Sequence, residues 1–151
     1  MAAATKGKWT FRTAALLFVV SALTEMVPPT APVPLFGAMS GGAVALFYHV
    51  FYAGLYVGLG AGLWQARPWG YNLVLFTTGV YTLDRLQLLV FRKAVLTDLL
   101  SKPGPLGEVL AAVDRPLLLT VFTAATLMIL LCWWGFAMYA YMRRDYFRNA
   151  E

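Results

Sequence analysis

The residues from 43 to 64 form an apolar run that is interrupted only by His49. A run of about 20 apolar residues is long enough to cross the hydrocarbon core of a bilayer as a helix. Inside a membrane every backbone N–H and C=O must be paired internally, so a spanning segment is a helix or a strand of a closed barrel. Barrel strands alternate polar and apolar residues, and this run does not. It therefore predicts a membrane-spanning helix.

Three further apolar runs of similar length extend over residues 9–27, 71–91 and 117–141. The whole chain of 151 residues is 60% hydrophobic and 13% charged, whereas a soluble domain has about 25% charged residues. We therefore predict one all-α integral membrane domain over residues 1–151, built as a four-transmembrane-helix bundle. The short link after residue 64 makes the second and third spans antiparallel neighbours.

The loops differ in character. Four prolines between residues 28 and 34 end the first span, because proline cannot continue a helix. We interpret this uncharged loop as a stiff connector on the membrane surface. Residues 92–116 contain two short amphipathic patterns at helical spacing. They predict two short helices in the outer loop, lying on the membrane surface.

Basic residues flank the outermost spans. The net charge is +5, and six of the cations are Lys6, Lys8, Arg12, Arg143, Arg144 and Arg148. Such clusters are typical of cytoplasmic flanks, so both termini are predicted to be cytoplasmic and the first and third loops to lie outside. The expected partners are membrane lipids rather than nucleic acid. Composition favours a bacterial inner membrane.

Ionisable residues inside the apolar runs are the most informative ones. The predicted topology brings Glu25, His49, Asp84 and Arg85 into the outer half of the bundle. A charge near the middle of a membrane costs about 2.5–3.5 kcal/mol on insertion scales, so such groups tend to face inward and pair. We predict that His49 and Asp84 lie in direct or water-bridged contact, and that Arg85 points to the outer interface or to Glu25.

This set of residues has two interpretations. It either fixes the register of the helices, or it lines a cavity that binds a ligand or relays protons. Histidine has an ordinary pKa of about 6.5, so His49 is suited to proton exchange. Tyr52, Tyr56 and Tyr81 are then either pocket walls or packing residues.

Gly54, Gly58 and Gly62 recur at every fourth position of the second span. This spacing makes a smooth groove on a helix, where another helix can approach closely. The groove predicts close packing either within the chain or between chains, as in a homo-oligomer or a complex with a partner membrane protein.

The sequence limits the chemistry available. It contains one cysteine, Cys132, and one histidine. An internal disulfide, a Cys/His metal set and a bis-histidine haem within one chain are therefore excluded. No metal or cofactor is expected.

These features favour a non-enzymatic tetraspan membrane protein that acts as an accessory or scaffold, or binds a lipid or small apolar ligand. One alternative is a proton-coupled transporter that acts as an oligomer, with Asp84 and His49 carrying protons. Another is a lipid-modifying enzyme with His49 as general base and Asp84 orienting it.

Overall fold

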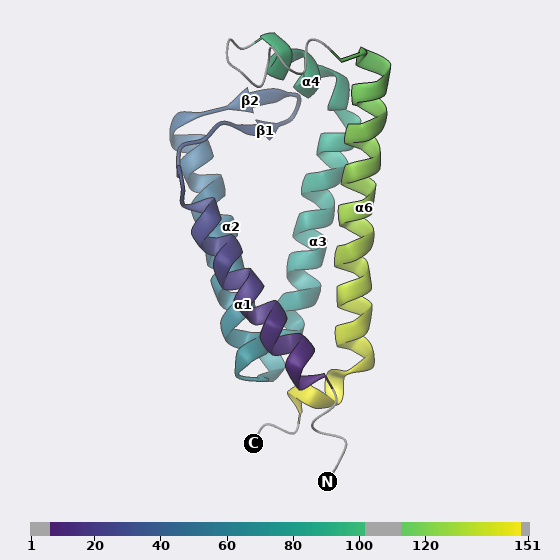
Figure 1. Cartoon of the computed structure of the whole chain (residues 1–151). Coiled ribbons are helices and arrows are strands. Elements are labelled where there is room, and N and C mark those ends of the chain that lie inside the picture. Colours follow the sequence, from purple (N-terminus) through teal and green to yellow (C-terminus); the bar gives the residue numbers. More distant parts are fainter. Residues whose placement is uncertain (1–6, 102–112, 149–151) are drawn as a thin grey trace.

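The computed structural model describes residues 7–101 and 113–148. In these residues the helices and strands follow in the order α1 (Lys8–Glu25), β1 (Val33–Leu35), β2 (Ala38–Ser40), α2 (Gly42–Trp64), α3 (Pro68–Val90), α4 (Arg92–Ser101), α6 (Arg115–Met142) and the 3-10 helix η1 (Arg144–Phe147). The four long helices lie lengthwise along one another (Figure 1). We call the end that carries β1, β2 and α4 the hairpin end. The opposite end, where α1 begins and α6 ends, is the terminal end.

Among the residues that the structure describes, three helices are long and apolar enough to cross a membrane, namely α2, α3 and α6. The remaining long helix, α1, has 18 residues and carries Lys8, Arg12 and Glu25. Many large apolar side chains on these helices are exposed, including Leu83 at 70% and Leu131 at 73%. Soluble monomers rarely expose apolar patches of such extent, so the surface indicates association with a membrane.

Each predicted span corresponds to one of the long helices, with bounds that differ by at most three residues. Pro68 and Pro116 lie in the first turns of α3 and α6, where the missing N–H of proline costs no helical hydrogen bond. Asp114 precedes α6, but its side chain makes no capping hydrogen bond.

The first loop is not a plain connector but contains a β-hairpin, which the sequence analysis missed. Val33 pairs with Ser40 and Leu35 with Ala38. Between the strands, Phe36 and Gly37 have φ values of 47° and 91°. Two consecutive positive φ angles are what a two-residue turn needs to match the twist of its strands. Gly37 supplies one at little cost, whereas Phe36 adopts it under tertiary constraint.

The third loop begins as predicted, with a short helix that buries Val95 and Leu96. This helix, α4, lies across the hairpin end close to β2 (Figure 1). Most of the second predicted helix, from residue 106 to residue 113, lies outside the described residues.

Aromatic side chains fill much of the core. At the terminal end, the Phe11 ring stacks on Tyr146 at 4.8 Å and contacts Phe147 at 5.0 Å between ring centroids. The hydroxyl of Tyr146 also donates a hydrogen bond to the Leu63 carbonyl at 3.2 Å. The 3-10 helix η1 therefore ties the start of α1 to the end of α2, and its Phe147 ring also lies 5.9 Å from that of Tyr71 near the start of α3, between centroids.

The glycines of α2 face different neighbours. A Cβ atom placed on Gly62 would lie 2.6 Å from the Cα of Gly70, so α2 and α3 approach backbone to backbone there. Gly58 faces only the Leu73 side chain, and Gly54 has open space around it. The predicted groove is thus not used as one surface. Gly60, which is outside the predicted series, faces the Ala15 carbonyl of α1 at 3.2 Å from such a Cβ.

Candidate functional site

A group of polar side chains gathers at the hairpin end. We call it the polar cluster, and its members are Glu25, Tyr48, His49, Asp84, Arg85 and Gln87. They come from α1, α2 and α3. The cluster contains all four ionisable residues that the sequence analysis placed in the outer half of the bundle.

His49 joins three segments of the chain. Its Nδ1 atom lies 2.7 Å from Oε2 of Glu25, the last residue of α1. Its Nε2 atom lies 3.0 Å from the carbonyl oxygen of Ala31, in the loop before the hairpin. The side chains of His49 and Glu25 are 11% and 25% exposed. The imidazole therefore fastens the end of α1 and the first loop to α2.

These contacts fix one proton and share another. A carbonyl oxygen only accepts, so Nε2 of His49 must carry hydrogen to bond Ala31. The contact between Nδ1 and Glu25 then holds one further proton. Either an imidazolium donates it to a carboxylate, or a protonated Glu25 donates it to a neutral imidazole. The two forms differ only in the position of that proton.

Asp84 is held by different partners. The hydroxyl of Tyr48 donates to Oδ2 of Asp84 at 3.2 Å, and Nε of Arg85 lies 3.5 Å from the same oxygen. The Arg85 guanidinium also lies over the Tyr81 ring, 4.5 Å from its centroid. The ion pair and the cation–π contact are thus adjacent.

The direct contact predicted between His49 and Asp84 is not formed, because each of the two residues has another hydrogen-bond partner. Adjacent residues of a helix point about 100° apart, so Tyr48 and His49 cannot both face α3. Tyr48 therefore hydrogen-bonds to Asp84 of α3, and His49 points toward α1 and binds Glu25. Arg85 likewise contacts Asp84 and Tyr81 rather than Glu25.

The tyrosines predicted as possible pocket walls pack against one another. Tyr52 lies 6.1 Å from Tyr56 and 6.3 Å from Tyr81 between ring centroids, and all three are buried. Tyr81 continues the contact to Trp133 of α6 at 4.9 Å. This arrangement agrees with packing residues that link α2, α3 and α6.

Gln87 is a member of the cluster that the sequence analysis did not select. Its Oε1 accepts a hydrogen bond from the Phe36 N–H at 2.8 Å, and its Nε2 donates to the Pro34 carbonyl at 3.0 Å. The side-chain amide of Gln87 thus both accepts and donates a hydrogen bond to the hairpin backbone, as a peptide group of a neighbouring strand would. On the other side of the hairpin, Oδ2 of Asp98 accepts from the Met39 N–H at 3.0 Å. The sequence signal that could have identified Gln87 is a single glutamine within an apolar run.

The chemistry of the cluster is that of hydrogen bonding and proton sharing. Within residues 7–101 and 113–148, no group of three or more His, Cys, Asp or Glu side chains is placed to hold a metal ion. Comparisons of the chain with family models, curated proteins and solved structures found no significant match.

Proposed function

We propose that the protein is a non-enzymatic, four-span membrane scaffold or accessory protein whose polar cluster holds its helices in one arrangement. The observation that carries this proposal is the pairing of His49 with both Glu25 and Ala31. Polar side chains that hydrogen-bond to two other segments of the chain stabilise the arrangement of those segments. Removing one partner would leave a polar group unpaired in an apolar setting, which costs about 1–3 kcal/mol.

The fourth span of this proposal is α1. Its 18 residues correspond to about 27 Å of helix, close to the roughly 30 Å of a hydrocarbon core. Its charged residues are near its ends, and Leu17, Val20 and Leu23 between them are exposed. The guanidinium of Arg12 lies over the Trp64 ring at 5.0 Å, a position suited to an interface.

The proposed orientation places the terminal end in the cytoplasm of a bacterial cell and the hairpin end outside its inner membrane. Its support is the set of basic residues at the terminal end, which are Lys8, Arg12, Arg67, Arg143, Arg144 and Arg148. The positive-inside rule counts such flanking cations.

Labelling of single cysteines tests the four spans and their orientation. In a Cys132→Ser background, Lys8→Cys, Thr30→Cys and Arg67→Cys are made one at a time. A reagent that cannot cross the membrane should reach position 30 from outside, and positions 8 and 67 only after the membrane is opened. If positions 8 and 30 react from the same side, α1 does not span the membrane.

A double-mutant cycle tests the clasp made by Glu25 and His49. Each alanine variant should lower the unfolding free energy in detergent by about 1–3 kcal/mol. The double variant should cost little more than the larger single change, because the second partner is already lost. His49→Ala combined with Tyr146→Phe at the other end is the control and should be additive within about 0.5 kcal/mol. Additive losses for Glu25 and His49 would refute the clasp.

Proton-coupled transport by an oligomer is the second candidate function. It is favoured by a row of polar side chains in space, which are Glu25, His49, Tyr48 and Asp84. The outer pairs are hydrogen-bonded, and the ring centroids of Tyr48 and His49 lie 5.8 Å apart. Flux driven by a pH gradient in proteoliposomes should then be lost in Asp84→Asn and in His49→Ala. Flux that survives both changes, or its absence in the parent protein, would count against transport.

A further inference from the structure

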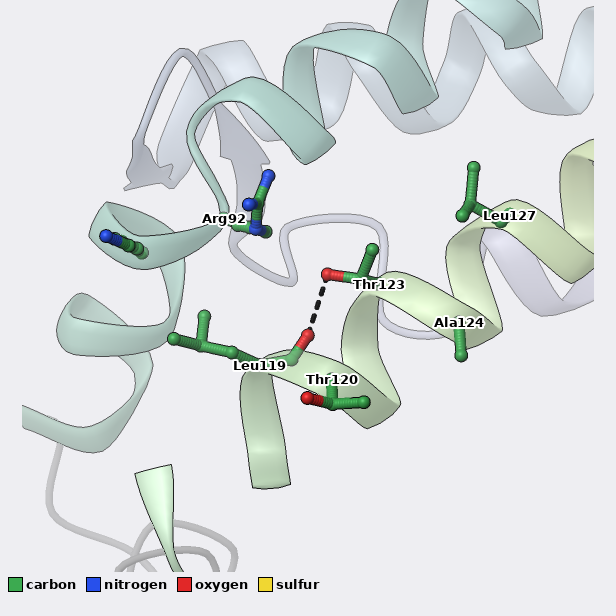
Figure 2. A pocket seen from close by; sticks show the side chains of 7 residues that line it. Arg92, Leu119, Thr120, Thr123, Ala124 and Leu127 are labelled. Carbon is green, nitrogen blue, oxygen red and sulfur yellow. Dashed lines mark hydrogen bonds between the residues drawn. The ribbon is translucent and has the colours of Figure 1, made fainter. Parts of the chain in front are cut away.

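A groove at the hairpin end lies between α6 and the junction of α3 with α4. It has a volume of about 360 Å³ and is lined by Arg92 and Lys93 on one side. Figure 2 shows Arg92 opposite the α6 residues, which are Leu119, Thr120, Thr123, Ala124 and Leu127. We call this the α6 groove.

The wall of the α6 groove is apolar in effect although it contains two threonines. The Thr123 hydroxyl donates to the Leu119 carbonyl at 2.7 Å, the contact dashed in Figure 2. The Thr120 hydroxyl donates to the Pro116 carbonyl at 2.9 Å. Both donors are thus used within α6, and hydroxyls bonded in this way add little polarity to a helix surface.

Cations gather at the mouth of the groove. A second, smaller hollow of about 160 Å³ adjoins it, sharing Lys93 and Leu119 and adding Arg115. One nitrogen of Arg92 donates to the Leu89 carbonyl at 2.9 Å, which leaves other guanidinium donors for a ligand. Among acidic residues here, Asp114 is next to Arg115 in the chain, and Asp98 bonds the hairpin. The described mouth therefore carries an excess of positive charge.

We propose that the α6 groove binds an anionic phospholipid, with its phosphate at Arg92, Lys93 and Arg115 and one acyl chain along α6. Leu119 and Leu127 are separated by about 12 Å along the helix axis. Half a hydrocarbon core is about 15 Å thick, so the groove matches one leaflet in depth. Its charged mouth and apolar floor complement both parts of such a lipid.

The proposal depends on the membrane insertion proposed above and is independent of the clasp. The groove and the clasp have no residue in common. The three cations also lie at the end that the positive-inside rule assigns to the outside. The positive-inside rule therefore does not explain these cations, whereas binding of an anionic lipid does.

Native mass spectrometry of the delipidated protein tests the proposal, with phosphatidylglycerol and phosphatidylcholine of identical chains as probes. The parent protein should retain phosphatidylglycerol preferentially. A cation near an anionic membrane surface contributes about a fivefold change in affinity. The variant Arg92→Gln/Lys93→Gln/Arg115→Gln should therefore bind at least about tenfold more weakly. If that variant does not fold, Lys93→Gln/Arg115→Gln replaces it.

Two controls separate the groove from general charge. The variant Lys8→Gln/Arg67→Gln/Arg143→Gln removes as many cations at the terminal end and should leave this preference intact. Ala124→Trp fills the groove and should weaken binding, whereas Ala125→Trp changes the neighbouring exposed alanine outside it and should not.

Three results would overturn the proposal. The first is equal retention of the two lipids by the parent protein. The second is an equal loss of affinity in the terminal-end control. The third is displacement of phosphatidylglycerol by inorganic phosphate, which would indicate a site for a free anion. A double-mutant cycle that fails for the clasp would leave all of these measurements interpretable.

Discussion

The contact between Gly62 and Gly70 predicts a steep cost for one added methyl group. The Cβ of Gly62→Ala would lie 2.6 Å from the Cα of Gly70, whereas carbon atoms in contact prefer about 3.5–4.0 Å. Backbone lies on both sides of this contact, so no side chain can turn away. The two helices must separate by about 1 Å to restore an ordinary contact.

The separation is resisted locally, because α2 and α3 are joined by a short turn. The Arg67 N–H donates to the Gly62 carbonyl at 3.2 Å within it. Overpacking of this kind costs about 1–3 kcal/mol, and we expect the upper half of that range. Replacing a helical glycine by alanine returns at most about 1 kcal/mol of helix propensity. Gly62→Ala should therefore unfold more easily than the parent by about 1–2 kcal/mol.

Two other glycines of α2 provide matched controls. Gly54→Ala meets nothing within 4 Å and should be neutral or stabilising by up to about 1 kcal/mol. Gly58→Ala meets only a Leu73 methyl group at 2.9 Å, which can rotate, so its effect should be intermediate. The larger change Gly58→Leu should cost several kcal/mol where a neighbouring helix fills the groove, and the contact with a side chain alone indicates a smaller cost.

The assay is unfolding of the purified variants in mixed micelles, followed by circular dichroism during titration with sodium dodecyl sulfate. The expected order of stability is Gly54→Ala, then Gly58→Ala, then Gly62→Ala. If Gly62→Ala were as stable as Gly54→Ala, the close approach of α2 and α3 would be refuted.

Three further changes address the hairpin and the two ends. Gln87→Glu loses the donor to Pro34 and should raise hydrogen exchange in the hairpin, with a stability loss of about 1–3 kcal/mol; unchanged exchange would contradict its role. Tyr48→Phe should cost about 0.5–1.5 kcal/mol, and Asp84→Asn should weaken that effect in a thermal unfolding cycle if the two groups are bonded. Burial raises the pKa of Tyr146 above its ordinary value, and this effect exceeds the lowering by the nearby Arg12. The folded protein therefore favours the neutral form of Tyr146. That contribution is complete below about pH 10 and declines above it. Tyr146→Phe should therefore show a shallower fall in stability than the parent in alkaline titrations, and parallel curves would refute this.

The long helices could be predicted from the sequence because their signal is local. An apolar run near 20 residues, such as the one ended by Pro28, defines a helix without reference to any partner. The hairpin could not be predicted in the same way. Its turn needs a positive φ at Phe36, which is unfavourable for that residue alone. Gln87 and Asp98, which are distant in sequence, bond the strands.

The ionisable members of the polar cluster were predicted from the sequence, but Gln87 and the pairing of the side chains were not. Depth along a helix follows from residue number, so Glu25, His49 and Asp84 were correctly assigned to one end. Which of them meet depends on the rotation of each helix about its axis. The glycine contacts depend on the same rotation, and for this reason Gly62 contacts α3 closely while Gly54 does not.

Four properties could be obtained from the amino-acid sequence alone: the helical class, the approximate helix bounds, the membrane-compatible surface and the end of the molecule at which ionisable groups collect. These properties follow from hydrophobicity, proline positions and the fixed rise of a helix, all of which are local. Three contacts become visible once the helices are packed: His49 binds Glu25, Tyr48 binds Asp84, and Arg92 faces a groove on α6. Those contacts depend on helix rotation and on the fold of the loops, which many weak packing interactions set together.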